Sequence, residues 1–342
     1  MSLPSDLSPE QSESQSQSTM PDARQLTRFF SRALDSFQKS TASEVSIICT
    51  RRPNGSPGSQ QFIPPNPAPP RARPRMLIVL DSSFNPPTRA HLRMATSAIY
   101  DLTENKGQEL ETLRLLLLLS VQNADKAPKP AAFDQRLAMM WHFAGDIQDI
   151  LQGKEQTKLL EVDIALAAKP YFHEKSEAID QADFYKGALS VEDGPEPEPV
   201  SMGQVFLVGY DTLIRIFDPK YYRPQPGSSS VDGPSSMQRA LGPLFARARL
   251  RVTMRTDDEW GGEEDQIRYL DGLIKDNGLE RIGGSGEWGT RIEMVKGKEV
   301  GADIVSSTYA RAAAKDGDGQ RLEKMVTPKV RQWIEEEGLY HE

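Results

Sequence analysis

The sequence Met-Leu-Ile-Val-Leu at residues 76–80 runs directly into Asp-Ser-Ser-Phe-Asn-Pro-Pro-Thr-Arg-Ala-His-Leu-Arg-Met at residues 81–94. The first five residues are apolar and predict a short β-strand, and small turn-forming residues follow them. A helical pattern begins at Thr88 and continues to Tyr100, with His91 one turn inside it. Backbone N–H groups, a hydroxyl and an imidazole therefore gather at a helix N-terminus, which is a natural site for a phosphate group.

Downstream, the pattern alternates between strands and helices. The run 113–120 is almost wholly apolar, which is typical of a strand buried on both faces. Repeated strand–helix units predict an α/β fold, a parallel sheet flanked by helices, with right-handed crossovers. Ligands in such sheets bind beyond the carboxyl ends of the strands, where the topology reverses. The other predicted strands are 159–162, 205–208 and 250–254, and the other predicted helices are 133–143 and 212–217.

The N-terminal part of the chain differs in composition from the rest. Residues 1–22 are rich in Ser, Gln and Pro and predict a disordered tail. Residues 23–50 hold an amphipathic helix at 23–39 and a short strand at 45–50. Residues 51–75 contain five Arg, eight Pro and no acid, which predicts an extended basic linker. We therefore expect the main domain to span 76–342, with surface insertions at 193–199 and 224–236.

Composition limits the classes of protein. The chain has 41 basic and 49 acidic residues, so its net charge of −8 argues against a nucleic-acid partner. The single cysteine, Cys49, excludes an internal disulfide framework and a cysteine zinc cluster. Neither a membrane-spanning apolar run nor the apolar core of a signal peptide is visible. We expect a soluble protein of the cytoplasm, and of the nucleus as a further location, with no membrane partner.

A second candidate site lies near the C-terminus, where residues 304–311 read Ile-Val-Ser-Ser-Thr-Tyr-Ala-Arg. Ser306 or Ser307 is expected to cap a helix that begins near Thr308. That helix end would offer N–H groups and a partial positive charge to phosphates, and Arg311 would add a planar fork of donors. Taken alone, the run indicates only a helix cap.

Both stretches resemble one family. Residues 81–94 are similar to the Gly-Ser-Phe-Asn-Pro-x-Thr-x-x-His-Leu-Arg-Met signature of nicotinamide mononucleotide adenylyltransferases, and residues 304–311 to the Ile-Ser-Ser-Thr-x-x-Arg signature of the same family. Residues 326–340 resemble its closing helix. The resemblance covers 76–340 and implies a Rossmann-like nucleotidylyltransferase fold, here with an N-terminal helical extension. It also implies transfer of an adenylyl group from ATP to nicotinamide mononucleotide, giving NAD and pyrophosphate.

The resemblance implies a role for each motif residue. His91, Thr88 and Arg311 would be catalytic, with His91 stabilising the transferring phosphate. Read alone, His91 would be an ordinary packed or surface histidine. Mg²⁺ would arrive with the triphosphate and be held mostly by phosphates and water, so no metal-binding residue is expected. The residues expected to bind the nucleotide are Ser83, Phe84, Asn85, Lys126, Gly209, Asp211, Arg255, Ser307 and Thr308.

Two of these roles have open alternatives. Lys126 is expected to bind phosphate, as a lysine of the family does in this loop, but Lys129 competes for the role and either could be a solvated loop lysine. Gly209 and Asp211 are expected near the ribose, but Asp211 could simply cap the helix that it opens.

The sequence also departs from the family pattern. Residues 162–165 read Val-Asp-Ile-Ala where the family has Val-Asp-x-Trp, so the tryptophan that stacks on nicotinamide is missing, and Tyr171 or Phe172 could replace it. Ser82 stands where the family has glycine. These departures indicate a divergent, fungal-type branch. The alternatives are another phosphate-bearing acceptor, ATP hydrolysis, or an ATP-binding protein whose N-terminal region recruits a protein partner in protein quality control.

Overall fold

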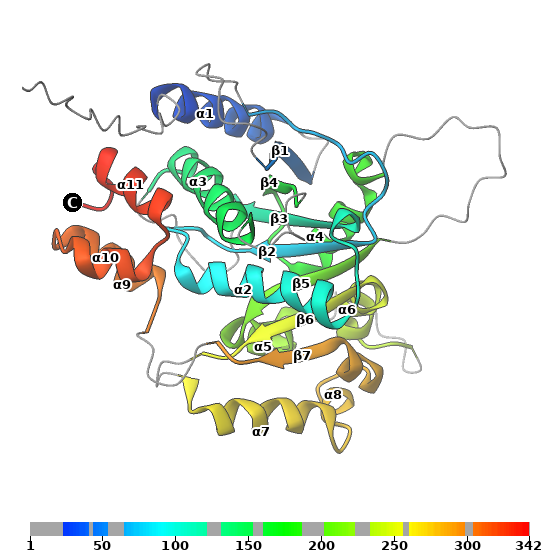
Figure 1. Ribbon diagram of the computed structural model, residues 1–342. Coiled ribbons are helices and arrows are strands. Elements are labelled where there is room, and N and C mark those ends of the chain that lie inside the picture. Colours follow the sequence, from blue (N-terminus) through cyan, green and yellow to red (C-terminus); the bar gives the residue numbers. More distant parts are fainter. Residues whose placement is uncertain are drawn as a thin grey trace, which may run out of the picture.

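The computed structural model describes residues 23–40, 44–53, 65–121, 131–152, 160–186, 202–222, 233–255, 260–297 and 304–341. Helices cover both faces of a twisted sheet of seven strands (Figure 1). The strands are β1 Val45–Arg51, β2 Met76–Asp81, β3 Leu113–Ser120, β4 Val162–Ala167, β5 Gly203–Gly209, β6 Ala248–Thr253 and β7 Ile292–Val295.

The strand order is β1-β4-β3-β2-β5-β6-β7. Strands β2 to β7 are all parallel to their neighbours, and β1 alone is antiparallel, against β4. From β2 the chain adds β3 and β4 on one side, then returns to add β5, β6 and β7 on the other. The topology therefore reverses between β2 and β5, and a ligand crevice is expected beyond their carboxyl ends.

Two layers of helices enclose the sheet. One layer contains α1, α2 and α3 with the three C-terminal helices, and the other contains α4, α5 and α6, while α7 and α8 lie beyond β7 (Figure 1). The helices are α1 Ala23–Lys39, α2 Arg89–Tyr100, α3 Phe133–Gln152, α4 Phe172–Gln181, α5 Tyr210–Ile216, α6 Ser236–Arg247, α7 Glu263–Ile274, α8 Gly278–Arg281, α9 Ser307–Lys315, α10 Gly319–Met325 and α11 Pro328–Glu336.

The central strands are buried on both faces, as their continuous apolar sequence predicts. Ile78 and Leu80 of β2 pack in one core cluster, and Leu77 and Val79 pack in the other. Alternation along a strand thus supplies both cores from one short segment. The prediction of a parallel α/β sheet flanked by helices is confirmed.

The N-terminal segment is integrated with this sheet. Leu26, Phe30 and Phe37 of α1 are buried in the same core cluster as α3, and β1 adds an edge strand to β4. The predicted helix 23–39 and strand 45–50 are therefore confirmed. The amino-acid composition changes at Arg75, where the predicted linker ends, but the N-terminal segment packs against the sheet as part of the same core.

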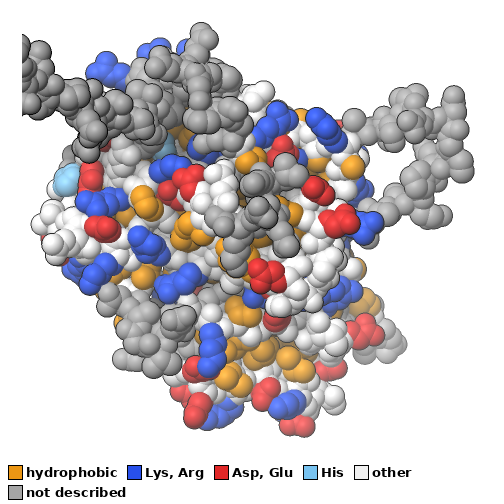
Figure 2. Space-filling model, viewed as in Figure 1, with side chains coloured by type: hydrophobic (Ala, Val, Ile, Leu, Met, Phe, Trp, Pro, Cys, Tyr) orange, Lys and Arg blue, Asp and Glu red, His pale blue; other side chains and the backbone are white. Residues whose placement is uncertain are grey.

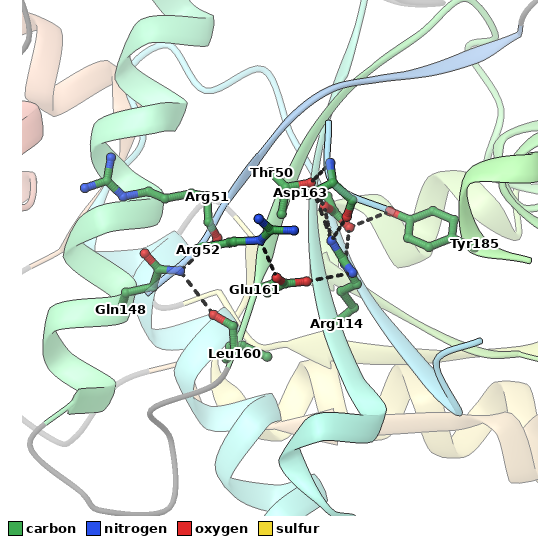
Figure 3. A network of polar contacts seen from close by, with 10 residues as sticks. Thr50, Arg51, Arg52, Arg114, Gln148, Leu160, Glu161, Asp163 and Tyr185 are labelled. Atoms are coloured by element: carbon green, nitrogen blue, oxygen red, sulfur yellow. Dashed lines mark hydrogen bonds and ion pairs between the residues drawn. The ribbon is translucent and has the colours of Figure 1, made fainter. Parts of the chain in front are cut away.

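The third parallel strand differs from its prediction. The pattern predicts 159–162, but β4 occupies Val162–Ala167 and includes Asp163. A charged residue near the start of a buried strand is tolerated because Arg114 of β3 pairs with it, with Nε 2.7 Å and Nη2 3.0 Å from the two carboxylate oxygens. The Thr50 hydroxyl donates to Asp163 at 2.7 Å, and the Tyr185 hydroxyl donates at 3.1 Å (Figure 3).

This network also holds part of the predicted linker. The Nη2 group of Arg114 donates to the Ala68 carbonyl at 2.7 Å, and the Ala68 N–H donates to the Thr50 hydroxyl at 3.0 Å. Arg114 and Asp163 are the second residues of β3 and β4, so the network lies at the amino ends of the strands. It is therefore at the opposite end of the sheet from the expected crevice.

Several other predictions can be compared with the structure. Helix α2 has the predicted bounds, whereas α3 continues nine residues beyond the predicted end at 143 because its apolar face stays buried to Leu151. The predicted tail 1–22, the acidic run 193–199 and most of the insertion 224–236 lie outside the described residues.

The surface carries mixed charge. Acidic and basic side chains are interspersed over the face shown in Figure 2. Within the described ranges, no helix is long and apolar enough to cross a membrane.

Candidate active site

The loop between β2 and α2 lies at the carboxyl end of the central strand. Thr88 is the N-cap of α2 and is buried, as are Phe84 and Asn85, while Ser83 is exposed. Phe84 adopts a positive φ of 44°, an uncommon conformation for a residue with a side chain, and its ring is fully buried with its centroid 5.6 Å from that of His91. The loop is thus held by its own side chains around the imidazole.

The imidazole of His91 is held through both ring nitrogens. The backbone N–H of Thr88 donates to Nδ1 at 3.0 Å, and the Thr88 hydroxyl lies 2.9 Å from the same nitrogen. The hydroxyl of Ser82 lies 2.9 Å from Nε2. Because an N–H can only donate, Nδ1 must accept, and the neutral ring carries its proton on Nε2.

His91 is neutral at physiological pH. Burial of the ring and, to a smaller extent, the positive charge of Arg255 together lower its pKa from 6.5 to about 4. A neutral imidazole with Nε2–H is a hydrogen-bond donor that adds no net charge. Such a donor suits a site that receives a polyanion and its metal.

Helix α9 docks on the same loop, although it lies more than 200 residues further along the chain. Ser306 caps α9 by accepting the Tyr309 N–H at 3.2 Å, so the cap is Ser306 and the helix begins at Ser307. The Ser307 hydroxyl donates to the Pro86 carbonyl at 2.8 Å. The Nη1 group of Arg311 donates to the Asn85 carbonyl at 2.7 Å. The two motifs found in the sequence therefore form one surface.

Arg311 uses part of its guanidinium for this docking. Its Nη2 group also lies 3.2 Å from the Thr308 hydroxyl, on the first turn of the helix. Arginine carries five N–H donors, so these contacts leave donors for a phosphate group.

A second pair of predicted residues meets at the carboxyl ends of β5 and β6. Gly209 is the N-cap of α5, and a Cβ placed on it would lie 2.6 Å from Oδ1 of Asp211. No side-chain hydrogen bond from Asp211 caps α5; its carboxylate lies 3.6 Å from Arg255 and 3.8 Å from Arg215. A side chain at position 209 would therefore displace this carboxylate from its place beside Arg255. The open alternative of Asp211 as a helix cap is not what the structure shows.

Two residues that support the site were not singled out in the sequence. The Tyr340 hydroxyl donates to Oδ1 of Asn85 at 2.8 Å. The fully buried Gln266 of α7 accepts from the Arg255 N–H at 2.9 Å and donates to the Arg255 carbonyl at 2.8 Å. Tyr340 falls in the segment 326–340 that resembles the closing helix of the family, whereas no sequence pattern indicates Gln266.

The position of β4 bears on which aromatic residue could stack on the nicotinamide ring of an acceptor. Ala165, at the position of the missing tryptophan, is fully buried and lies two residues before the carboxyl end of β4. Aromatic residues instead follow the carboxyl end of β4. The rings of Tyr171 and His173 are stacked with centroids 5.7 Å apart, and Tyr221 and Tyr222 lie against them at 6.2 Å each. Burial lowers the pKa of His173, so its imidazole is neutral within this aromatic cluster.

Some expected site features cannot be placed. Lys126 and its competitor Lys129 lie outside the described residues. Within the described ranges, no group of three or more His, Cys, Asp or Glu side chains could hold a metal ion.

A helix N-terminus at a topological switch point, with a second helix docked on it, is an arrangement that can bind phosphate groups. No family model matches the chain. A Schizosaccharomyces pombe protein provisionally named nicotinamide mononucleotide adenylyltransferase is 34% identical over 254 residues, which are 74% of this chain and 82% of that relative. The chain belongs to the nicotinamide mononucleotide adenylyltransferase family.

The matches among solved structures are more distant in sequence. Plasmodium falciparum nicotinic acid mononucleotide adenylyltransferase in complex with NaAD is 12% identical, with a TM-score of 0.39, and the match covers 78% of this chain and 98% of that chain. A nicotinate-nucleotide adenylyltransferase structure from Vibrio parahaemolyticus is 15% identical, with a TM-score of 0.30, covering 78% and 96%.

Proposed function

We propose that the protein transfers the adenylyl group of ATP to nicotinamide mononucleotide, giving NAD and pyrophosphate. The observation that carries the proposal is the docking of α9 on the β2–α2 loop, which brings Arg311 and Ser307 to the helix end that holds His91. Membership of the family supports the same reaction.

In this reaction an oxygen of the acceptor's 5′-phosphate attacks the α-phosphorus of ATP. A new P–O bond forms, and the bond to the pyrophosphate oxygen breaks. Negative charge grows on the non-bridging oxygens, so a positioned donor lowers the barrier without forming a covalent intermediate. His91 supplies that donor through Nε2–H. Mg²⁺ bound to the triphosphate would neutralise part of its charge.

The remaining residues divide into two groups. Thr88 is 1% exposed and contacts Nδ1, so it acts on the reaction through His91 and is a positioning residue. Arg311, Thr308 and Ser307, together with Lys126, would hold the phosphate chain. Asp211 and Gly209 would face the ribose, with Arg255 beside them.

For the acceptor, the aromatic cluster after β4 offers a platform for the nicotinamide ring. Tyr171 lies at the carboxyl end of a strand on the same edge of the sheet as the loop that holds His91. Offset stacking of an aromatic ring on such a platform is favourable by about 0.5–1.5 kcal/mol beyond its area. Tyr171 is therefore the residue of this chain that we expect to replace the missing tryptophan.

The test is product analysis with ATP and Mg²⁺, with and without nicotinamide mononucleotide, on the wild-type protein and His91→Ala. NAD and pyrophosphate in equal amounts from the wild type alone would support the proposal. Pyrophosphate or ADP without NAD would replace it with another acceptor or with ATP hydrolysis. ATP binding without turnover would favour the ATP-binding interaction protein.

A further inference from the structure

Ser82 is the first residue after β2, and its position is well defined. Its N–H donates to the Leu118 carbonyl of β3 at 3.2 Å, which continues the ladder between the two strands beyond Asp81. Its hydroxyl reaches across the loop to Nε2 of His91 at 2.9 Å. The side chain is thus held between the central strand and the imidazole.

The direction of this contact follows from the other ring nitrogen. Nδ1 accepts from the Thr88 N–H, so in the neutral ring Nε2 carries the proton and donates to Ser82. His91 therefore cannot remove the hydroxyl proton of Ser82, and Ser82 is not an activated nucleophile. The serine is an acceptor that occupies the donor of His91.

One N–H group makes one strong, nearly linear hydrogen bond. A phosphate oxygen that accepts from Nε2–H must lie along the same direction and at nearly the same distance as the Ser82 hydroxyl oxygen. The two oxygens therefore exclude each other. A rotation about the Cα–Cβ bond of Ser82 would free the position without moving the backbone.

We propose that the Ser82 hydroxyl occupies the place of an α-phosphate oxygen in the nucleotide-free protein, and that it must leave His91 when a nucleoside triphosphate binds. Ser82 is thus a positioning residue that competes with the nucleotide for Nε2–H. The inference deepens the proposed function and rests on it, because it assigns the phosphate to His91. A glycine at this position, as in the motif that the loop resembles, would leave the donor open.

The competition predicts a gain of affinity on removal of the hydroxyl. The net free energy of one such hydrogen bond, about 0.5–1.5 kcal/mol, corresponds to a change of roughly 2- to 10-fold. We expect Ser82→Ala and Ser82→Gly to bind a non-hydrolysable ATP analogue with Mg²⁺ about 2- to 10-fold more tightly than the wild type. Damage to the fold would instead weaken binding of the analogue. Ser97→Ala, which removes an exposed hydroxyl of α2, is the matched control and should leave the affinity unchanged.

The decisive measurement is a double-mutant cycle by calorimetry. In a His91→Ala background, Ser82→Ala should no longer change the Kd of the analogue, because the competition needs the imidazole. Equal or weaker binding by Ser82→Ala, or a gain that persists without His91, overturns the inference. So does the absence of analogue binding by the wild type.

Failure of the proposed function has a different signature. Coupling between Ser82 and His91 in analogue binding, without NAD formation, would leave the inference standing and remove the acceptor assignment. NAD formation without coupling between Ser82 and His91 would support the proposed function and overturn the inference about Ser82.

Discussion

The backbone N–H of Thr88 donates to Nδ1 of His91 at 3.0 Å, and this contact decides which ring nitrogen carries the proton. A histidine one turn inside a helix folds back onto the cap residue, so the helix end and the imidazole form one rigid unit. The Nε2–H donor is therefore oriented before any nucleotide binds. Preorganised donors of this kind stabilise developing charge without reorganisation during the reaction.

The first prediction concerns His91→Ala. This substitution removes the Nε2–H donor that the Thr88 contact orients. The rate of NAD formation should therefore fall by at least about a hundredfold, the usual scale for one transition-state donor. Steady-state rates with ATP and nicotinamide mononucleotide measure the effect. His341→Ala removes an exposed histidine and is the control. A loss of less than tenfold in His91→Ala, with an unchanged melting temperature, would contradict the assigned role.

The second prediction concerns Gly209 and Asp211. A methyl group on residue 209 would lie 2.6 Å from the Asp211 carboxylate, so Gly209→Ala should rotate Asp211 away from Arg255 while the protein stays folded. We expect the KM for ATP to rise about tenfold, roughly the value of one hydrogen bond to a charged group.

The double variant Gly209→Ala/Asp211→Ala distinguishes this mechanism. If Gly209→Ala acts through the carboxylate, the double variant should be no worse than Asp211→Ala alone. Additive losses would show that Gly209 matters for another reason.

The third prediction concerns Tyr171 and the acceptor. Replacing Tyr171 by Ala removes the ring that stacks on His173, and the KM for nicotinamide mononucleotide should rise about tenfold, with little change in the KM for ATP. Tyr171→Phe keeps the ring and should retain the wild-type KM. Equal changes in both KM values would indicate a structural role and argue against an acceptor platform.

The fourth prediction concerns the buried pair Arg114–Asp163. The side chain of Arg114 is 3% exposed and that of Asp163 is fully buried. Asp163→Ala leaves the buried guanidinium with Glu161, 2.8 Å from Nη1, as its remaining carboxylate partner, so the free energy of unfolding should fall by about 3 kcal/mol, the low end of the range for breaking a buried pair. Urea denaturation measures the loss.

The location of this pair supplies a control. Because the network lies at the amino ends of β3 and β4, turnover per folded molecule should be unchanged at low temperature. The double variant Arg114→Met/Asp163→Leu should lose less stability than Asp163→Ala, since it leaves neither charge unpaired. A specific loss of turnover would place the network in the site.

The fifth prediction concerns pH. His142 is buried against the ring of Trp333 with centroids 4.8 Å apart, and burial lowers its pKa from 6.5 to about 3. Because the pKa in the folded protein lies below the unfolded value, the stabilisation is complete above pH 6.5 and is lost as the pH falls towards 3. We expect His142 alone to account for about 2 kcal/mol of stability lost between pH 7 and 4.5.

A variant tests the source of that loss. His142→Phe keeps a ring against Trp333 and removes the ionisable group, so its free energy of unfolding should fall by about 2 kcal/mol less over the same interval. An unchanged pH dependence would assign the loss to other groups, His91 among them.

The sheet class and the two helix starts that we expect to bind phosphate can be predicted from the sequence, because both are local. Continuous apolar runs at 76–80 and 113–120 specify doubly buried strands, and a helix start with His91 or Ser306 is specified by its own neighbours. Those parts do not depend on contacts between distant segments.

Contacts between residues far apart in the chain become visible only in the tertiary structure. The start of β4 was misplaced because Asp163 becomes compatible with a buried strand only when Arg114 pairs with it from another strand. The docking of Arg311 on Asn85 and the contact of Tyr340 with the same residue join segments more than 200 positions apart. Sequence periodicity carries no record of such pairs, since burial and charge compensation are properties of the packed chain.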